Sequence, residues 1–111
     1  MLISNYAKPK TGDIVSIRLS TGEEIVGKLL DSPLDYSEVV LEKPVLLHFQ
    51  QTAAGLDVKF GVPMVSGTTE QVSFFSTALM SRPLPTRENI VTSYKQATSP
   101  IITPQTGIIK P

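Results

Sequence analysis

The residues of this chain that could carry chemistry are few and widely spaced. His48 is the only histidine, and the chain has no cysteine. A catalytic Ser-His-acid triad or a metal site would each need partners for this imidazole, and the sequence shows none at a typical spacing. We therefore interpret His48 as a structural histidine whose ring is either hydrogen-bonded or partly buried.

Two carboxylates, Asp31 and Asp35, lie in one segment around Pro33. Paired carboxylates can act as general acid and base or bind a hard cation. Acidic residues beside prolines are more typical of solvated turns. Gly61 and Gly67 belong to no phosphate-binding glycine motif. The sequence predicts a protein that is not an enzyme and uses no cofactor or metal.

Charge is unevenly distributed, although the formal net charge is zero. Residues 1–12 carry Lys8 and Lys10 for +2, and residues 81–111 carry four bases against Glu88 for +3. Residues 13–80 set four bases against nine acids, which is −5. Proteins bind nucleic acid largely by neutralising phosphates with Lys and Arg, so this acidic centre disfavours nucleic-acid binding.

The composition also indicates a compartment. The absence of cysteine fits a reducing environment. The first residues contain too short an apolar run for a signal peptide, and no run of about 18 apolar residues could span a membrane. We expect a soluble, cytoplasmic protein with no membrane partner.

Alternating apolar residues predict two strands joined by a tight turn. Val15 and Ile17 face one side of a strand over residues 13–20, and Gly22 supplies the positive φ of the turn. The second strand covers residues 23–31 and has Gly27 in its interior. An interior glycine is typical of a sharp bend or a close backbone approach, so we expect one of these at Gly27.

Three further strands follow a loop. The third covers residues 38–50, with Pro44 at an edge or a bulge because proline cannot donate to a ladder. The fourth covers residues 56–65. Residues 71–80 either extend the fourth strand and bend into a fifth near Ser76 and Thr77, which we favour, or form the fifth strand themselves. The pattern predicts an all-β fold, a small and strongly bent five-stranded barrel.

A C-terminal helix is predicted over residues 86–98. Thr86 is a suitable N-cap, and Glu88 in the first turn complements the helix dipole. One helical face carries Ile90, Val91, Tyr94 and Ala97. The chain thus divides into an N-terminal arm (1–12), a barrel (13–83), and a helix with an extended tail (84–111). Four isoleucines of that tail need apolar cover: Ile101, Ile102, Ile108 and Ile109.

Phe74 and Phe75 are adjacent, so on a strand their side chains point to opposite faces. One can enter the core, and the other needs a second apolar surface, either the C-terminal helix or another subunit. A five-stranded barrel of this size leaves edges that natural proteins pair, charge or cover. We therefore expect a homo-oligomer with Phe74, Phe75 and Leu79 at the interface.

The chain resembles the Sm-like family, most specifically in the first motif of that family. This motif is matched by Leu19, Gly22, Gly27 and Leu29, with residues 39–41 returning as the next strand. The resemblance covers residues 13–83 and implies a ring of five to seven or so subunits that often binds uridine- or adenine-rich single-stranded RNA. The long tail resembles a divergent Sm-like branch of cyanobacterial and related phages.

The chain departs from this family at its RNA pocket. The resemblance implies a nucleic-acid pocket with Asp35 as the acid and Tyr36 as the stacking residue. Cationic contacts would come from the arms, from Lys8, Lys10 and Arg82. Glu38 stands where the family has asparagine, and a glutamate repels phosphate and cannot donate to a base. Residues 75–77 replace an Arg-Gly pair, which removes a phosphate partner.

Two functions stay open. The first is a non-enzymatic homo-oligomeric Sm-like ring that binds single-stranded RNA weakly. The second is a protein-interaction or assembly ring of phage origin that binds no nucleic acid and contacts another protein through its tail. In the second case the compartment is the cytoplasm of the host cell.

Overall fold

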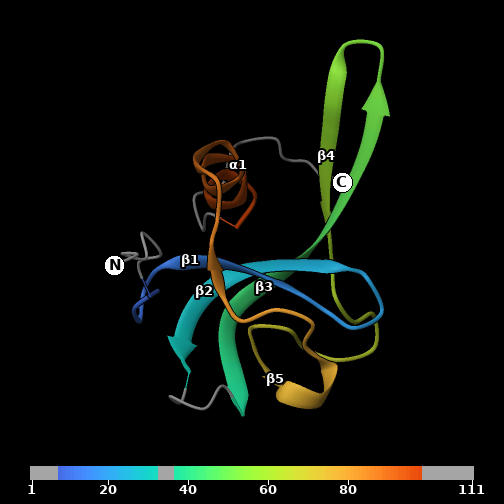
Figure 1. Cartoon of the computed structure of the whole chain (residues 1–111). Helices are drawn as coiled ribbons and strands as arrows, with labels where there is room; N and C mark the ends of the chain where they lie inside the picture. The colour runs from blue at the N-terminus through green and yellow to red at the C-terminus, as the bar shows by residue number, and fades with distance from the viewer. Residues whose placement is uncertain (1–7, 33–36, 99–111) are drawn as a thin grey trace, which may run out of the picture.

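The computed structural model describes residues 8–32 and 37–98. They form a mostly β structure, one antiparallel sheet of six strands with a short C-terminal helix (Figure 1). The elements in chain order are β1 (Ile14–Arg18), β2 (Glu24–Asp31), β3 (Glu38–Thr52), β4 (Gly55–Gly61), β5 (Gln71–Phe75), the 3-10 turn η1 (Ser76–Ala78), β6 (Leu84–Pro85) and α1 (Glu88–Thr98). Within the described residues, no helix has the length and apolar character needed to cross a membrane.

The strands follow the order β4-β3-β2-β1-β6, and β5 pairs with β3. The predicted turn between the first two strands is confirmed, with Gly22 at a φ of +104°. Beside this turn Arg18 and Glu24 are cross-strand partners and form an ion pair of 2.7 Å. Both side chains are partly exposed, so the pair contributes at most about 1 kcal/mol.

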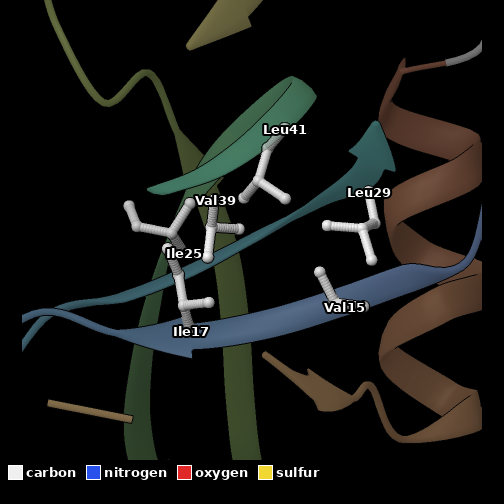
Figure 2. Close-up of a cluster of buried hydrophobic side chains, with 6 residues drawn as sticks. All are labelled: Val15, Ile17, Ile25, Leu29, Val39 and Leu41. Atoms are coloured by element: carbon white, nitrogen blue, oxygen red, sulfur yellow. The ribbon is translucent and has the colours of Figure 1, made fainter. Parts of the chain in front are cut away.

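The core lies on one side of β1, β2 and the first half of β3. Val15 and Ile17 on β1 are almost fully buried, as the alternation predicts. They pack with residues of β2 and β3 (Figure 2): Ile25, Leu29, Val39 and Leu41. The opposite faces of these strands carry Ser16, Lys28 and Glu42, which are not buried.

β3 is long and changes partner halfway. Its first half pairs with β5 from Glu38 to Glu42, and its second half pairs with β4 from Leu46 to Thr52. Lys43 lies at the change with a φ of +50°, directly before Pro44. Pro44 is therefore at an irregularity, as predicted, where neither edge ladder needs its missing N–H.

Gly27 lies opposite this bend. A Cβ built on Gly27 would be 3.0 Å from the Leu41 Cβ and 3.2 Å from the Pro44 Cα. The β2–β3 register also shifts between Val26 and Lys28. The predicted close backbone approach is confirmed.

The hydrogen-bonded ladders do not close into the predicted five-stranded barrel. β5 ends at Phe75, the chain bends through η1, and Leu79 forms an isolated bridge with Leu19. Two backbone hydrogen bonds flank this bridge, from Ser20 N to Ala78 O (2.8 Å) and from Met80 N to Arg18 O (2.7 Å). The bend expected near Ser76 and Thr77 is present. After it the chain forms only the single bridge between Leu79 and Leu19, and not the predicted fifth strand of a barrel.

The fourth strand is shorter than predicted. It ends at Gly61 instead of continuing to residue 65, and β5 begins at Gln71 as a separate strand on the same partner, β3. Val62 and Val65 between them are exposed, Val65 at 94%. The apolar residues of this segment alternate as they would in a strand, but they do not pack against the core, so the pattern predicts a strand that is not formed.

α1 begins two residues later than predicted. The Arg87 carbonyl accepts hydrogen bonds from the backbone N–H groups of Ile90 (3.0 Å) and Val91 (2.9 Å). Thr86 is not the N-cap, because its hydroxyl hydrogen-bonds the Ser16 hydroxyl at 2.7 Å. Ala97 is exposed, so the predicted apolar face is confirmed only in part.

Tyr94 anchors α1 to the sheet. It is the one buried residue of the helix. Its hydroxyl lies 2.7 Å from the Lys43 carbonyl and 3.1 Å from the Glu42 carbonyl, both at the bend of β3. Burial raises the pKa of the Tyr94 phenol, and the negative charge of Glu42 adds to this rise.

Candidate functional site

Among the described strands, β4, β5 and β6 each pair with a single neighbour and so have an open edge. β4 lies on the hairpin that extends away from the core (Figure 1), and two open edges lie beside the core. One edge is that of β5, which pairs with β3 and with no other described strand. The other lies beyond β1, where β6 is the last strand of the sheet. We call these the β5 edge (Gln71–Phe75) and the β6 edge (Met80 with Leu84–Pro85).

The two adjacent phenylalanines point to opposite faces, as predicted, but Phe74, which the sequence also predicted at the subunit interface, faces the core. Phe74 pairs with Val39 and packs against the core. Phe75 pairs with Glu38 and is 60% exposed. The described helix therefore does not cover Phe75, which stays an open apolar surface on the β5 edge.

The β6 edge is apolar as well. Met80 is 62% exposed and Leu84 is 40% exposed. Sequence reasoning selected Leu79, but Leu79 is half-buried and packs against the core. Met80 is the exposed neighbour. Alternation along an extended segment places Leu79 and Met80 on opposite faces but does not tell which of them faces the core.

A hollow beside the N-terminal arm gathers basic and polar groups. Its lining includes Lys8, Lys10 and Thr11 from the arm, Asp31 and Ser32 from the end of β2, and Pro83. Ser32 Oγ is buried and has no hydrogen-bond partner among the described residues. The arm therefore lies beside the region before β6 where Arg82 is exposed.

The predicted nucleic-acid residues are only partly described. Asp35 and Tyr36 lie outside the described residues. Glu38 is half-buried at the start of β3, opposite Phe75, and does not line the hollow of the arm. The described part of the chain thus places the basic arm near Pro83, while Glu38 belongs to the β5 edge.

His48 is exposed, so the alternative of a partly buried ring is wrong. It pairs with Lys59 on the hairpin formed by β3 and β4, which extends away from the core (Figure 1). Residues 8–32 and 37–98 contain no group of three or more His, Asp or Glu placed to hold a metal ion.

Comparison of the chain with protein-family models and with curated proteins gives no match.

Proposed function

We propose that this protein is a non-enzymatic assembly module, an Sm-like fold that forms a homo-oligomeric ring through its β5 edge and its β6 edge. The observation that carries the proposal is the exposure of Phe75 on an edge strand with no described partner on its outer side. Burying a fully exposed phenylalanine is worth about 1.5 to 3 kcal/mol, and Phe75, at 60% exposed, can gain roughly three-fifths of that. The open edge also offers backbone groups for pairing.

The two edges favour a ring over a simple dimer. The β5 edge carries Phe75, and the β6 edge carries Met80 and Leu84, so the two surfaces differ in residues and in position. A contact between two different surfaces is head-to-tail, and head-to-tail contacts close into rings when the rotation allows it. The resemblance to the Sm-like family, whose members form rings, supports the same assembly.

Lysine substitutions test this assembly. Phe75→Lys and Met80→Lys should each lower the mass measured by light scattering, because each places a charge in a contact that must lose water. Leu56→Lys is the matched control, since Leu56 is also 60% exposed but lies at the start of β4, at the tip of the hairpin and opposite Gln51 of β3. An unchanged mass for both edge variants would contradict the proposal.

Mixing the two edge variants tests the head-to-tail arrangement. Phe75→Lys keeps an intact β6 edge, and Met80→Lys keeps an intact β5 edge. Their equimolar mixture should form a one-to-one heterodimer of twice the 12.0 kDa subunit mass and should not close a ring. If the contact instead joined two identical surfaces, the mixture would show no heterodimer that is absent from the two separate variants.

Weak binding of single-stranded RNA is a second candidate function. The support is the hollow that brings Lys8 and Lys10 beside Pro83, with a buried Ser32 hydroxyl that has no described partner. Asp31 lines the same hollow and opposes phosphate binding. We rank this function below assembly because few cations are available to neutralise phosphates.

A further inference from the structure

The hairpin of β3 and β4 has one apolar face that lies outside the core. The register pairs Leu47 with Phe60, Phe49 with Val58, and Gln51 with Leu56, and cross-strand partners share a face. We call the apolar members the hairpin outer face: Leu47, Phe49, Leu56, Val58 and Phe60. Phe49 is 59% exposed and Leu56 is 60% exposed. The other three members are half-buried. A partly exposed apolar cluster on one face of an element is typical of a docking surface.

The reverse face of the hairpin is polar. It presents two further cross-strand pairs, His48 with Lys59 and Gln50 with Asp57. Among the described residues of the hairpin, only Leu46, at the base of this face, packs against the core. Beyond Leu46 the hairpin is amphipathic. A binding partner for the outer face must be apolar and must approach from one side of the sheet.

α1 lies on that same side. Along β2, Ile25 and Leu29 face the core, while Glu24, Val26 and Lys28 alternate with them and lie on the other, outer face of the sheet, where Val26 is nonetheless buried. Leu47 is the cross-strand partner of Glu24, so it also lies on this outer face. Lys28 and Glu42 line a hollow together with Tyr94 and Thr98 of α1. The helix and the hairpin outer face thus share the outer side of the sheet.

The last residue of α1 lies at the base of the hairpin. Thr98 lines a second hollow with Val45, Gly61 and Val62. Val45 is two residues before Leu47 on the same strand face, so it continues the hairpin outer face toward the helix. Any residues after Thr98 begin at this base.

We propose that residues 99–111 of the same chain bind along the hairpin outer face, with Ile101 and Ile102 on Phe49 and Val58. These thirteen residues lie outside the described part, and their sequence contains two isoleucine pairs. Ile101 and Ile102 are three and four residues beyond Thr98, a reach of about 10 to 14 Å in an extended chain. Phe49 is four strand residues beyond Val45, about 13 Å along the hairpin.

The second isoleucine pair provides a contrast. Ile108 and Ile109 are ten and eleven residues beyond Thr98, a reach of about 33 to 39 Å when extended. The hairpin continues only seven residues past Val45, to Thr52, or about 23 Å. An extended segment therefore carries Ile108 and Ile109 past the tip, and only the first pair matches the apolar face.

Engineered cysteines test the contact in the full chain, which has no native thiol. Val58→Cys combined with Ile101→Cys should form a disulfide within one chain under mild oxidation. Lys59→Cys combined with Ile101→Cys is the control, because Lys59 is the next residue along β4 and points to the opposite face. The first pair should react several times faster than the second on a non-reducing gel.

Two outcomes of this experiment would overturn the proposal. Equal rates for the two pairs would show that Ile101 does not lie on the outer face. A covalent dimer from Val58→Cys with Ile101→Cys would show that a second copy, and not the same chain, occupies the face. Circular dichroism of each variant shows that its strand content is intact.

Hydrogen exchange on full-length variants without cysteine is an independent measurement. The double variant Ile101→Ser with Ile102→Ser should lose protection at the amides of residues 47–60 and keep protection in β1 and β2. Ile108→Ser with Ile109→Ser is the matched control and should match the wild type. Unchanged protection in the first variant would contradict the proposal. Neither variant should change the oligomer mass, which separates this contact from the open edges.

Discussion

Gly27 is the residue on which the bend of the sheet depends. A side chain at this position would point into the core beside Ile25 and Leu29, where Leu41 and Pro44 already approach the backbone. The absence of a side chain allows β3 to cross β2 closely while Lys43 adopts a positive φ. One glycine and one irregular pair on the facing strand together allow β3 to change partner from β5 to β4.

Gly27→Ala should destabilise the fold by about 1 to 3 kcal/mol, the usual cost of overpacking a core. The contacts that must give way include the Leu41 Cβ and the Pro44 backbone, which cannot rotate aside. Gly61→Ala is the control, because a Cβ there meets only the exposed His48 ring at 3.3 Å. Urea unfolding measures both, and equal losses for the two variants would show that the close approach is unimportant.

Tyr94 is the second decisive residue. Its hydroxyl is the only described side-chain group that hydrogen-bonds both carbonyls at the bend of β3. Tyr94→Phe should lower the free energy of unfolding at pH 7 by about 0.5 to 1.5 kcal/mol, the typical net value of a hydrogen bond. Thr92→Val, on an exposed helix position, is a suitable control because its hydroxyl bonds only the Glu88 carbonyl of its own helix.

The raised pKa of Tyr94 predicts a pH dependence. A phenol whose folded pKa exceeds its unfolded value of about 10 stabilises the fold fully below pH 10, and this stabilisation is lost as the pH rises through the folded pKa. The free energy of unfolding should therefore fall more steeply above about pH 10 in the wild type than in Tyr94→Phe. Parallel pH profiles for the two proteins would contradict this assignment.

At the scale of elements, the sequence predicts well those features that depend on the backbone conformation of a single residue. The turn at Gly22, the irregularity at Pro44 and the close approach at Gly27 each follow from what one residue can or cannot adopt. The alternation that separates Phe74 from Phe75 is equally local. These features fix the bent, antiparallel character of the sheet without any knowledge of its partners.

The parts that the sequence mispredicts depend on tertiary contacts. Thr86 has a side chain suited to an N-cap, but its hydroxyl forms a hydrogen bond with the Ser16 hydroxyl on β1 instead. His48 resembles a core residue between Leu47 and Phe49, yet the hairpin extends past the core and leaves both faces open. Leu79 and Met80 are both apolar, and only the bridge to Leu19 decides which faces inward.

α1 is the element whose removal is most informative. Truncation after Pro85 removes Tyr94 and its contact with the bend, and should lower the Tm by about 5 to 15 °C while strand content is kept. A second truncation, after Thr98, keeps the helix and removes only residues 99–111. Comparing the two truncations therefore distinguishes the effect of the helix on the Tm from the effect of the residues that follow it. Thermal melts monitored by circular dichroism give both values, and an unchanged Tm after the longer truncation would show that the helix does not stabilise the sheet.

At the scale of the whole molecule, charge argues against strong RNA binding. Binding to oligo-uridine or oligo-adenine should be weak and lost by about 200 mM salt, because few cationic contacts can release counterions. Lys10→Glu, in the hollow beside the N-terminal arm, should weaken RNA binding further. Lys59→Glu on the hairpin is the control of equal charge change. Fluorescence anisotropy at several salt concentrations measures this, and tight, salt-resistant binding would contradict the ranking of assembly above RNA.

The proposed assembly would account for the large apolar side chains that are exposed on the β5 and β6 edges. Phe75 on the β5 edge and Met80 on the β6 edge are each about three-fifths exposed in a single chain. A head-to-tail contact covers one of each at every junction, so a closed ring leaves neither uncovered. The hairpin outer face is separate from both edges, which leaves it available to residues 99–111.

The mass of the wild-type protein in solution tests the central claim most directly. Native mass spectrometry at micromolar concentration should show one dominant closed assembly, an integer multiple of the 12.0 kDa subunit greater than two. Phe75→Lys should shift that population to smaller species, and Leu56→Lys should not. A stable, dispersed wild-type monomer would contradict the account, because its open edges would then need no partner.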